Sequence, residues 1–563
     1  METVLERDYA PGLRKTVLLL VLVIATAYRF YGVDHSGLWA SELWNAASVT
    51  HRGFLDVLSG SIQSGVDLPG YPVLLYVTSQ LFGHSELGMR LLSVLSGIGS
   101  VYLLLLLGRA CGSLTGGFLA ALLLAGSGLA VRYSQEAQSH TLFVFLALLQ
   151  CFIFLGHFRA AAFHESLPRP VSLLPVVWRL GGVTVSFESG RYASSKRFSG
   201  FWLASILLLF VHYAGFFVVV TEYLLCVCFS RGFDRSGLND SGREQVAALA
   251  RSIFPPLLGF GLLFFPVVFV HIEKIMTMPD VSQSPNLTVK SLILTFSGTS
   301  RWLQGLELVG CLMVIFHLMR RFMSRTLDAD DFSVLVLFCI VFVTLLSLLA
   351  NIQAQVPVRI SLLLLFSQPF IFLFVGLGVC GFVRRFLLAI GYQSFIVGIV
   401  VAVIAVSVFW LQILQNRDAD LFSRSRKPDL RQPIQIIAAD QDFMRGFRTV
   451  FTTNSQAEYY LDYYGIRQYN PFSLEKTQAG NARIVRNFFS DDVFYFLDVA
   501  ELKGPEKNTA LFDALSTQYG MLCMTRFSAA TLVKFKGKPS RLRPAAIPTC
   551  EEFLRIPTVI SPL

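Results

Sequence analysis

Charged residues are scarce in this sequence of 563 residues. Asp, Glu, Lys and Arg make up 15% of the chain, whereas hydrophobic residues make up 54% and the mean hydropathy is +0.58. Soluble domains contain about 25% charged residues, so this shortage excludes a soluble globular protein. The composition predicts a polytopic α-helical membrane protein.

The sequence also lacks a continuous basic stripe, although its formal net charge is +10. Its basic residues lie in short loops beside apolar segments, where the positive-inside rule accounts for them. Nucleic-acid binding needs basic residues gathered on one face, so we exclude nucleic acid as a partner.

A cleavage site is missing as well. The first apolar run ends in Tyr-Arg-Phe-Tyr (28–31), with no small residues of the kind that precede signal-peptide cleavage, so we interpret it as an uncleaved transmembrane helix. The chain has no phosphate-binding loop, no dinucleotide fingerprint before a strand and no Gly-x-Ser-x-Gly elbow.

Apolar windows long enough to cross a bilayer recur along the chain. We expect about eleven transmembrane helices, near residues 16–31, 87–107, 113–130, 141–158, 199–211, 214–229, 253–272, 304–319, 333–350, 360–380 and 394–415. The loops on one side of these helices carry most of the basic residues, which places that side and the N-terminus in the cytoplasm. The expected location is the plasma (inner) membrane, with the C-terminal residues periplasmic or extracellular.

The sequence changes character after residue 415. Residues 1–415 form the predicted transmembrane domain, with a first outer loop at 32–86, and residues 416–563 alternate between short apolar runs and amphipathic stretches. We expect strands at 432–439, 448–453, 491–499 and 530–536 and helices at 455–465 and 509–520. This alternation predicts a small α/β domain on the outer face.

Cysteine usage fits that arrangement. Seven of the nine cysteines lie in or beside apolar spans, and only Cys523 and Cys550 lie in the C-terminal domain. An oxidising compartment allows these two to pair, provided that their Cα atoms approach within about 7 Å. The sequence leaves that pairing open.

The first outer loop contains a carboxylate between two indoles. Glu42 lies between Trp39 and Trp44, and Asp67 precedes Pro69 later in the loop. The next outer turn, residues 130–142, is rich in polar and aromatic residues as well. These two stretches are the most promising places for chemistry.

Several motifs in this region resemble the GT-C membrane glycosyltransferases. They are LWASELW (38–44), DLPGYPVLLYVTSQLFGHSELGMRLLSVLSG (67–97) and YSQEA (133–137), and the likeness returns at 210–217 and 356–378. The sequence looks like the branch that contains the protein O-mannosyltransferases and the aminoarabinose transferase of lipid A. The resemblance implies a polyprenyl-phosphate-linked sugar donor, inversion at the sugar and an acceptor that is a lipid, a glycan or a protein.

The family usually carries an Asp-Glu pair after Leu-Trp-x, and its Asp is credited as the general base. Here the pair is Ser41-Glu42, so the Asp is missing. A base must hold a carboxylate within hydrogen-bonding reach of the acceptor hydroxyl. Glu42, with one more methylene than Asp, is the first candidate, and Asp67 is the second. Glu42 at the start of a helix, or Asp67 at the start of a turn, would also be explained by structure alone.

The remaining candidates follow from what a phosphodiester leaving group and a sugar need. Arginines near the bilayer surface suit the phosphate because they donate in a fork. Glu136 is a third catalytic candidate. The expected phosphate-binding residues are Arg90, Arg132 and Arg359, and the expected substrate-binding residues are Trp39, Trp44, Tyr71, Tyr133, Gln135 and His212.

The predicted function is therefore a membrane glycosyltransferase that acts on the extracytoplasmic face. The alternative, supported by Ser41, is a catalytically degenerate relative that serves as a structural or accessory subunit of a membrane complex. A transporter would need polar residues along its spans, and these are scarce. No tight zinc motif is present, so no metal ligand is assigned, although a divalent metal is compatible with the sequence.

Overall fold

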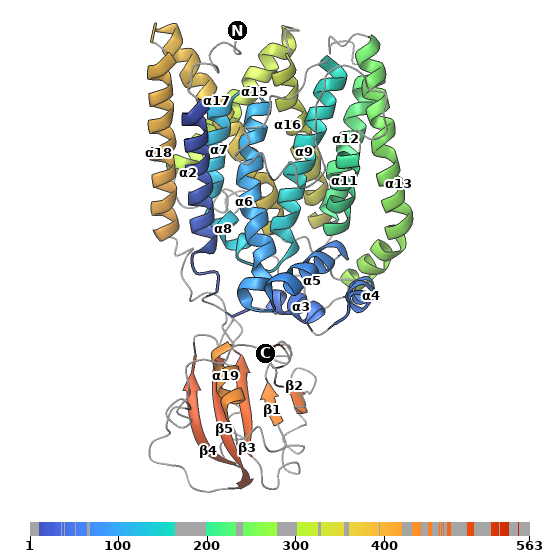
Figure 1. Ribbon diagram of the computed structural model, residues 1–563, viewed down its shortest axis with the longest axis vertical. Helices are drawn as coiled ribbons and strands as arrows, with labels where there is room; N and C mark the ends of the chain where they lie inside the picture. Colours follow the sequence, from blue (N-terminus) through green and yellow to red (C-terminus); the bar gives the residue numbers. More distant parts are fainter. Residues whose placement is uncertain are drawn as a thin grey trace. The chain divides into compact units, whose positions relative to one another are not determined.

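The structure is a computed structural model dominated by helices (Figure 1). It describes residues 11–163 except 35, 36, 39, 51 and 65–67, then 199–231, 240–277, 301–324, 328–353 and 360–418 except 393. Near the C-terminus it describes 431–440, 449–452, 470–473, 493–499, 519–527, 530–539 and the single residues 461, 463, 466 and 550.

A long helix or a bent pair of helices occupies each of the eleven expected windows. They are α2 (Pro11–Phe30), α6 (Glu86–Ala110), α7 (Leu114–Gly126) with α8 (Gly128–Ser134), α9 (Ser139–Phe163), α11 (Ser199–Val211), α12 (Ala214–Arg231), α13 (Asp240–Thr277), α15 (Arg301–Met323), α16 (Ala329–Gln353), α17 (Ile360–Ala389) and α18 (Ser394–Asp418). Among the described residues, six helices are long and apolar enough to cross a membrane, or seven if α7 and α8 form one span. The predicted class, a polytopic helical membrane protein, is confirmed, and the number of spans stays a prediction.

The chain divides into two compact units. The first contains residues 1–31, 58–74 and 92–422, and the second contains 32–57, 75–91 and 423–563. The second unit thus combines the C-terminal residues with two parts of the predicted first outer loop. That loop contributes three short helices, α3 (Ala40–Val49), α4 (Phe54–Ser64) and α5 (Gly70–Phe82).

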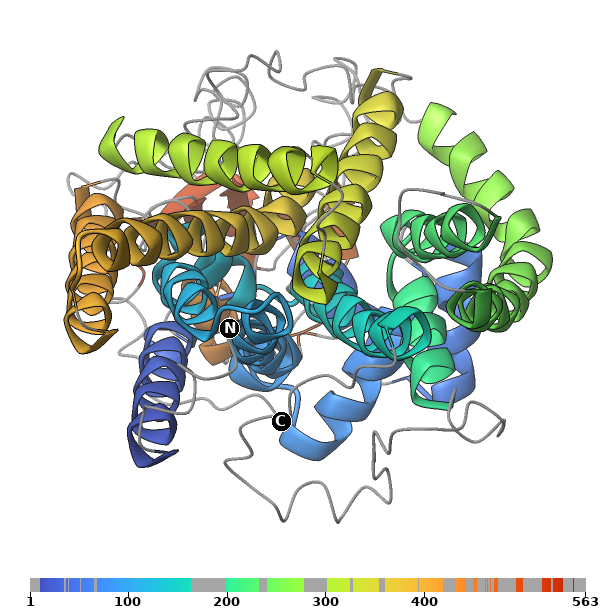
Figure 2. The same cartoon turned by 90° about the horizontal axis from the view of Figure 1, so that it is seen from above.

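Glycines allow the helices of the first unit to approach closely. A Cβ added at Gly376 of α17 would overlap the carbonyl oxygen of Gly116 of α7, and one added at Gly378 would overlap the carbonyl oxygen of Gly310 of α15. Figure 2 shows α15 running alongside α17. Small residues at helix contacts are typical of membrane bundles, where close backbone packing drives association.

The bend between α7 and α8 is stabilised by side chains from three elements. The two helices meet at 62° at Ser127, whose hydroxyl accepts from the backbone N–H of Ala130 and donates to Gln368 Oε1 of α17 at 2.9 Å. Arg29, at the end of α2, is buried and donates to the carbonyl oxygens of Leu124 and Ala125 at 3.3 and 3.4 Å. The Leu124 carbonyl also accepts from the backbone N–H of Ser127 at 3.4 Å, so the guanidinium completes the C-terminal cap of α7.

The second unit contains a five-stranded mixed sheet with the order β2-β1-β3-β5-β4. Its strands are β1 (Thr449–Thr452), β2 (Asn470–Ser473), β3 (Val493–Val499), β4 (Tyr519–Arg526) and β5 (Ala530–Pro539). β1 pairs in parallel with β2 and β3, whereas β5 is antiparallel to β3 and β4. Strands β1, β3 and β5 were predicted from the sequence, and β2 and β4 were not.

One expected strand of this domain is a helix. Residues 432–439 lie in α19 (Arg431–Ala439), where Pro433, Ile434, Ile436 and Ile437 are all buried. This spacing places the four side chains on one helical face, and a proline is tolerated in the first turn of a helix. The expected helix 455–465 is described only at Leu461 and Tyr463. Of the expected helix 509–520, residues 509–518 lie outside the described residues and the last two belong to β4.

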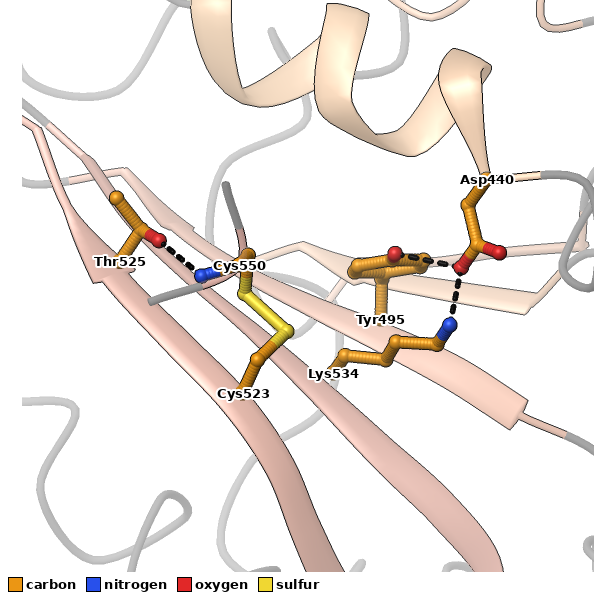
Figure 3. Close-up of a disulfide and its surroundings, with 6 residues drawn as sticks. All are labelled: Asp440, Tyr495, Cys523, Thr525, Lys534 and Cys550. Carbon is orange, nitrogen blue, oxygen red and sulfur yellow. Dashed lines mark hydrogen bonds and ion pairs between the residues drawn. A yellow bond between two sulfur atoms is a disulfide. The ribbon is translucent and has the colours of Figure 1, made fainter. Parts of the chain in front are cut away.

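Two features stabilise the C-terminal sheet (Figure 3). Cys523 of β4 and Cys550 form a disulfide with their Cα atoms 4.9 Å apart, and the backbone N–H of Cys550 donates to Thr525 Oγ1. Beside it, Asp440 Oδ2 accepts from Lys534 Nζ at 2.6 Å and from the Tyr495 hydroxyl at 2.7 Å. All three side chains are buried, so the cluster joins the end of α19 to β3 and β5 through satisfied polar groups.

Candidate active site

A buried ion pair joins the carboxylate of the first loop to the start of α6. Arg90 Nε lies 2.8 Å from Glu42 Oε1, and Arg90 Nη2 lies 2.7 Å from Glu42 Oε2. The two residues are 48 positions apart, and their exposed fractions are 1% for Arg90 and 0% for Glu42. This is the planar two-bond arrangement in which arginine binds a carboxylate most strongly.

Arg90 also organises the backbone ahead of α3. Its Nη1 donates to the carbonyl oxygen of Val33 at 2.5 Å, and its Nη2 donates to that of Gly37 at 3.0 Å. The guanidinium therefore fixes the segment that leads to Glu42 as well as Glu42 itself. Glu42 lies in the first turn of α3, where an acid also interacts favourably with the helix dipole.

Two C-terminal residues lie next to this pair within the second unit. The Tyr463 hydroxyl donates to the carbonyl oxygen of His84, and Arg431 Nη1 donates to the carbonyl oxygen of Asp34 at 3.1 Å. Arg431 Nη1 also lies 3.7 Å from Glu86 Oε1. Burial, with a further contribution from Glu86, raises the pKa of Tyr463 well above its usual range, so the phenol keeps its proton at neutral pH.

The second group of candidates belongs to the first unit and surrounds the turn from α8 to α9. Arg132 Nε lies 3.5 Å from Glu136 Oε1, and the Arg132 side chain is 42% exposed, whereas that of Glu136 is 2% exposed. Arg132 therefore has a guanidinium that solvent reaches, held by a buried carboxylate one turn away. This arrangement suits recognition of a phosphate, because the exposed part of the fork stays available to an anion.

Gln135 has a structural function in this turn. Its Nε2 donates to the carbonyl oxygens of Tyr28, Arg29 and Tyr31 at 3.3, 3.2 and 2.8 Å, which caps the end of α2. The amide nitrogen of Gln135, a predicted substrate contact, is therefore already engaged by the backbone.

Aromatic rings connect the start of α9 with the break between α11 and α12. The ring centroids of Tyr133 and His140 are 5.8 Å apart, and those of His140 and His212 are 6.0 Å apart. His212 Nδ1 accepts from the backbone N–H of Ala214 at 3.1 Å, so His212 caps α12. The structure thus brings together two of the predicted substrate-binding residues, Tyr133 and His212, through His140.

Two other candidates lie in short helices of the first loop, and three lie outside the described residues. Trp44 of α3 is 38% exposed, and Tyr71 of α5 is fully buried. Trp39, Asp67 and Arg359 are not among the described residues. Within the part of the chain that the structure describes, no group of three His, Cys, Asp or Glu residues is placed to hold a metal ion.

Three residues of these clusters were not predicted from the sequence. Arg29 is a single arginine at the end of the first apolar run, and that isolation was the available signal. Tyr463 lies in the aromatic stretch 458–465, which reads equally well as helix core. Arg431 had no local signal, because its partners are Asp34 and Glu86, far away in the sequence.

Comparisons with known proteins agree with this architecture. Residues 68–164 match the family model described as dolichyl-phosphate-mannose-protein mannosyltransferase. ArnT from Cupriavidus metallidurans in the apo state aligns over 92% of this chain and 97% of its own, with 12% identity and a TM-score of 0.51. ArnT bound to undecaprenyl phosphate aligns over 93% and 98%, with 10% identity and a TM-score of 0.50.

The archaeal oligosaccharyltransferase AglB from Archaeoglobus fulgidus, in complex with an inhibitory peptide and a dolichol-phosphate, aligns over 95% of this chain and 75% of its own. The identity is 11% and the TM-score 0.50. No curated protein gives a significant sequence match. The chain has the GT-C fold. The resemblance to GT-C glycosyltransferases that the sequence motifs indicated is confirmed at the level of fold.

The family match covers one part of the candidate site only. Residues 68–164 of the GT-C fold include Arg90 and the turn that carries Arg132 and Glu136, but not Glu42. Ser41, at which the loop departs from the family pattern, therefore lies outside the matched segment.

Proposed function

We propose that this chain is an integral-membrane glycosyltransferase that moves a sugar from a polyprenyl-phosphate donor to an acceptor on the extracytoplasmic face, with inversion. The observation that carries the proposal is the GT-C fold over more than nine tenths of the chain, shared with ArnT, which has been solved with undecaprenyl phosphate. The match of residues 68–164 to a mannosyltransferase family supports the same chemistry.

In this proposal, Arg132 and Arg359 bind the phosphate of the donor. Arg132 has the exposed guanidinium that such a role needs, whereas Arg90 is buried on Glu42 and the loop backbone. Arg90 therefore acts by holding the first loop in place. Tyr133 and His212 are proposed to contact the substrate, with Glu136 orienting Arg132.

The general base is either Glu42 or Asp67. A base must reach the acceptor hydroxyl with a free oxygen, and both oxygens of Glu42 receive hydrogen bonds from Arg90 in a fully buried position. This geometry favours a positioning role for Glu42. Asp67, in the same loop, is then the carboxylate that deprotonates the acceptor.

A second candidate function rests on the same geometry. In this alternative, the Glu42–Arg90 pair only stabilises the first loop and nothing replaces the missing Asp as a base. The chain is then an accessory subunit that has the fold but not the transferase activity. Ser41 and the burial of Glu42 favour this alternative. The two functions differ in turnover and not in fold.

The test uses the purified full-length chain in liposomes that contain radiolabelled polyprenyl-phosphate monosaccharides. We expect transfer or hydrolytic release of sugar by the wild type, and a loss of at least about 100-fold in Asp67→Asn if Asp67 is the base. Asp56→Asn is the matched control, because Asp56 is an exposed carboxylate of the same loop that caps α4.

Binding must be measured beside turnover. Polyprenyl phosphate should protect the wild type against thermal unfolding, and Arg132→Ala should weaken that protection. Protection without turnover for any sugar donor would favour the accessory subunit. The absence of both protection and turnover would overturn both functions.

A further inference from the structure

A carboxyl group lies in the middle of the first unit and takes no part in the proposed transfer. Glu222 is the ninth residue of the 18-residue helix α12, about 12 Å from the start of the helix at a rise of 1.5 Å per residue. Gln150 lies near the middle of α9. Gln150 Nε2 donates to Glu222 Oε2 at 2.7 Å, and both residues are fully buried.

One oxygen of each side chain in this pair lacks a hydrogen bond. Glu222 Oε1 and Gln150 Oε1 are buried and have no hydrogen-bond partner. Both atoms are acceptors if Glu222 is ionised, so neither can satisfy the other. No ion pair of the described residues involves Glu222, and its electrostatic neighbours are the thiols of Cys151 and Cys226.

A buried anion without a cation is among the most expensive groups in a membrane span. One proton on Glu222 removes the cost of the buried charge. It also supplies the hydrogen-bond donor that the two unsatisfied acceptors lack. If Glu222 Oε1 carries the proton, it donates to Gln150 Oε1 while Gln150 Nε2 donates to Glu222 Oε2. The acid and the amide then form a closed two-bond pair, the neutral counterpart of the arginine–carboxylate fork at Glu42.

We propose that Glu222 and Gln150 form a proton-binding site in the helix bundle, in which Glu222 is a neutral carboxylic acid paired with the Gln150 amide. The helices packed against α9 and α12 contain further neutral polar groups: the hydroxyls of Ser205 in α11 and Thr344 in α16 are also fully buried and without a partner. The ligand is the proton, because a single proton on Glu222 neutralises the buried charge and supplies the donor that Glu222 Oε1 and Gln150 Oε1 both lack.

The site joins two helices that begin beside His212, a candidate substrate residue, and its neighbour His140. α9 begins next to His140 and α12 begins just after His212, and these two rings are in contact. The helices therefore meet at their ends through the rings and at mid-length through the acid–amide pair. Loss of the proton leaves a buried anion between them, so the proton holds α9 and α12 together.

The protonation state of Glu222 is measurable without any enzymatic activity. The full-length protein, labelled with ¹³C at the glutamate carboxyls and reconstituted in lipid, gives one signal that disappears in Glu222→Gln. We expect that signal at the chemical shift of a protonated carboxyl at neutral pH, unchanged when choline replaces sodium. A carboxylate shift, or a shift that depends on sodium, would overturn the proposal.

Thermal unfolding supplies an independent readout. Glu222→Gln keeps a donor toward Gln150 Oε1 and should unfold at nearly the wild-type temperature, whereas Glu222→Leu and Gln150→Leu should each unfold several degrees lower. Glu244→Gln, on the exposed start of α13, is the control and should have no effect. If Glu222→Gln destabilises the protein as much as Glu222→Leu, Glu222 is not a neutral acid.

Discussion

At the scale of single residues, mutation of either member of the Glu42–Arg90 pair should strongly lower the free energy of unfolding. Two charges that are 0% and 1% exposed are stable only together, since removing one leaves the other buried without compensation. This makes the pair a sensitive probe of the first loop.

Arg90→Met and Glu42→Leu should each lower the free energy of unfolding by about 3–5 kcal/mol, because each leaves an unpaired buried charge. The double variant should be less unstable than either single variant. Arg52→Met is the control: Arg52 is an exposed arginine of the same loop, so the loss should stay within about 1 kcal/mol. Additive effects at Glu42 and Arg90, measured by thermal unfolding of the four proteins, would show that the pair is not coupled.

Arg29 permits a second prediction at this scale. Arg29→Met removes the donors to the carbonyl oxygens of Leu124 and Ala125 and should cost about 1–3 kcal/mol, because those carbonyls stay buried. Hydrogen exchange along α7 and α8 should rise in this variant. Arg251→Met is the comparison, because Arg251 is an exposed arginine that bonds only within its own helix. Equal exchange in the two variants would contradict a capping role for Arg29.

The sequence identified Glu42 and Arg90 separately, one as a base and the other as a phosphate ligand. Their pairing could not be predicted, because they are 48 positions apart and either residue alone fits a catalytic role as well as a structural one. Local patterns show which residue types are present. They do not show which of them neutralise each other.

At the scale of helices and strands, hydrophobic periodicity located the long elements well because each needs an unbroken apolar run. It failed at α19, where four apolar residues in a stretch of nine fit either a strand or a short helix. Close packing between helices is a further property that periodicity does not report. Gly116 and Gly376 look unremarkable in the sequence, yet they set the distance between α7 and α17.

Gly376→Leu should therefore separate α7 from α17. The side chain would overlap the carbonyl of Gly116, and overpacking of this kind typically costs about 1–3 kcal/mol. The Ser127–Gln368 hydrogen bond, on the same helix pair, should weaken with it. Gly259→Leu is the control, because a Cβ at Gly259 meets nothing within 4 Å. A wild-type unfolding temperature for Gly376→Leu would mean that the two helices pack less tightly than the structure indicates.

At the scale of the whole molecule, residues near the C-terminus contact segments of the first outer loop within the second unit. Residues after 423 form one compact unit with residues 32–57 and 75–91, through contacts such as Tyr463 with His84 and Arg431 with Asp34. The C-terminal domain was predicted from its alternating pattern, but contacts across nearly 400 residues have no local signature. The domain thus reaches the loop that carries Glu42.

Weakening those contacts should loosen the first loop while the C-terminal sheet stays intact. Tyr463→Phe removes only the hydroxyl that binds His84, and Arg431→Ala removes the bonds to Asp34 and Glu86. Hydrogen exchange should increase at 32–57 and 75–91 in both variants, and most in the double variant, because those backbone segments lose side-chain partners. Lys536→Ala, an exposed position on β5, is the matched control. Because Glu42 lies in the same loop, sugar transfer should fall in proportion to the added exchange if the loop positions the acceptor. Faster exchange with unchanged transfer would separate the C-terminal domain from catalysis, and unchanged exchange would show that these contacts do not hold the loop.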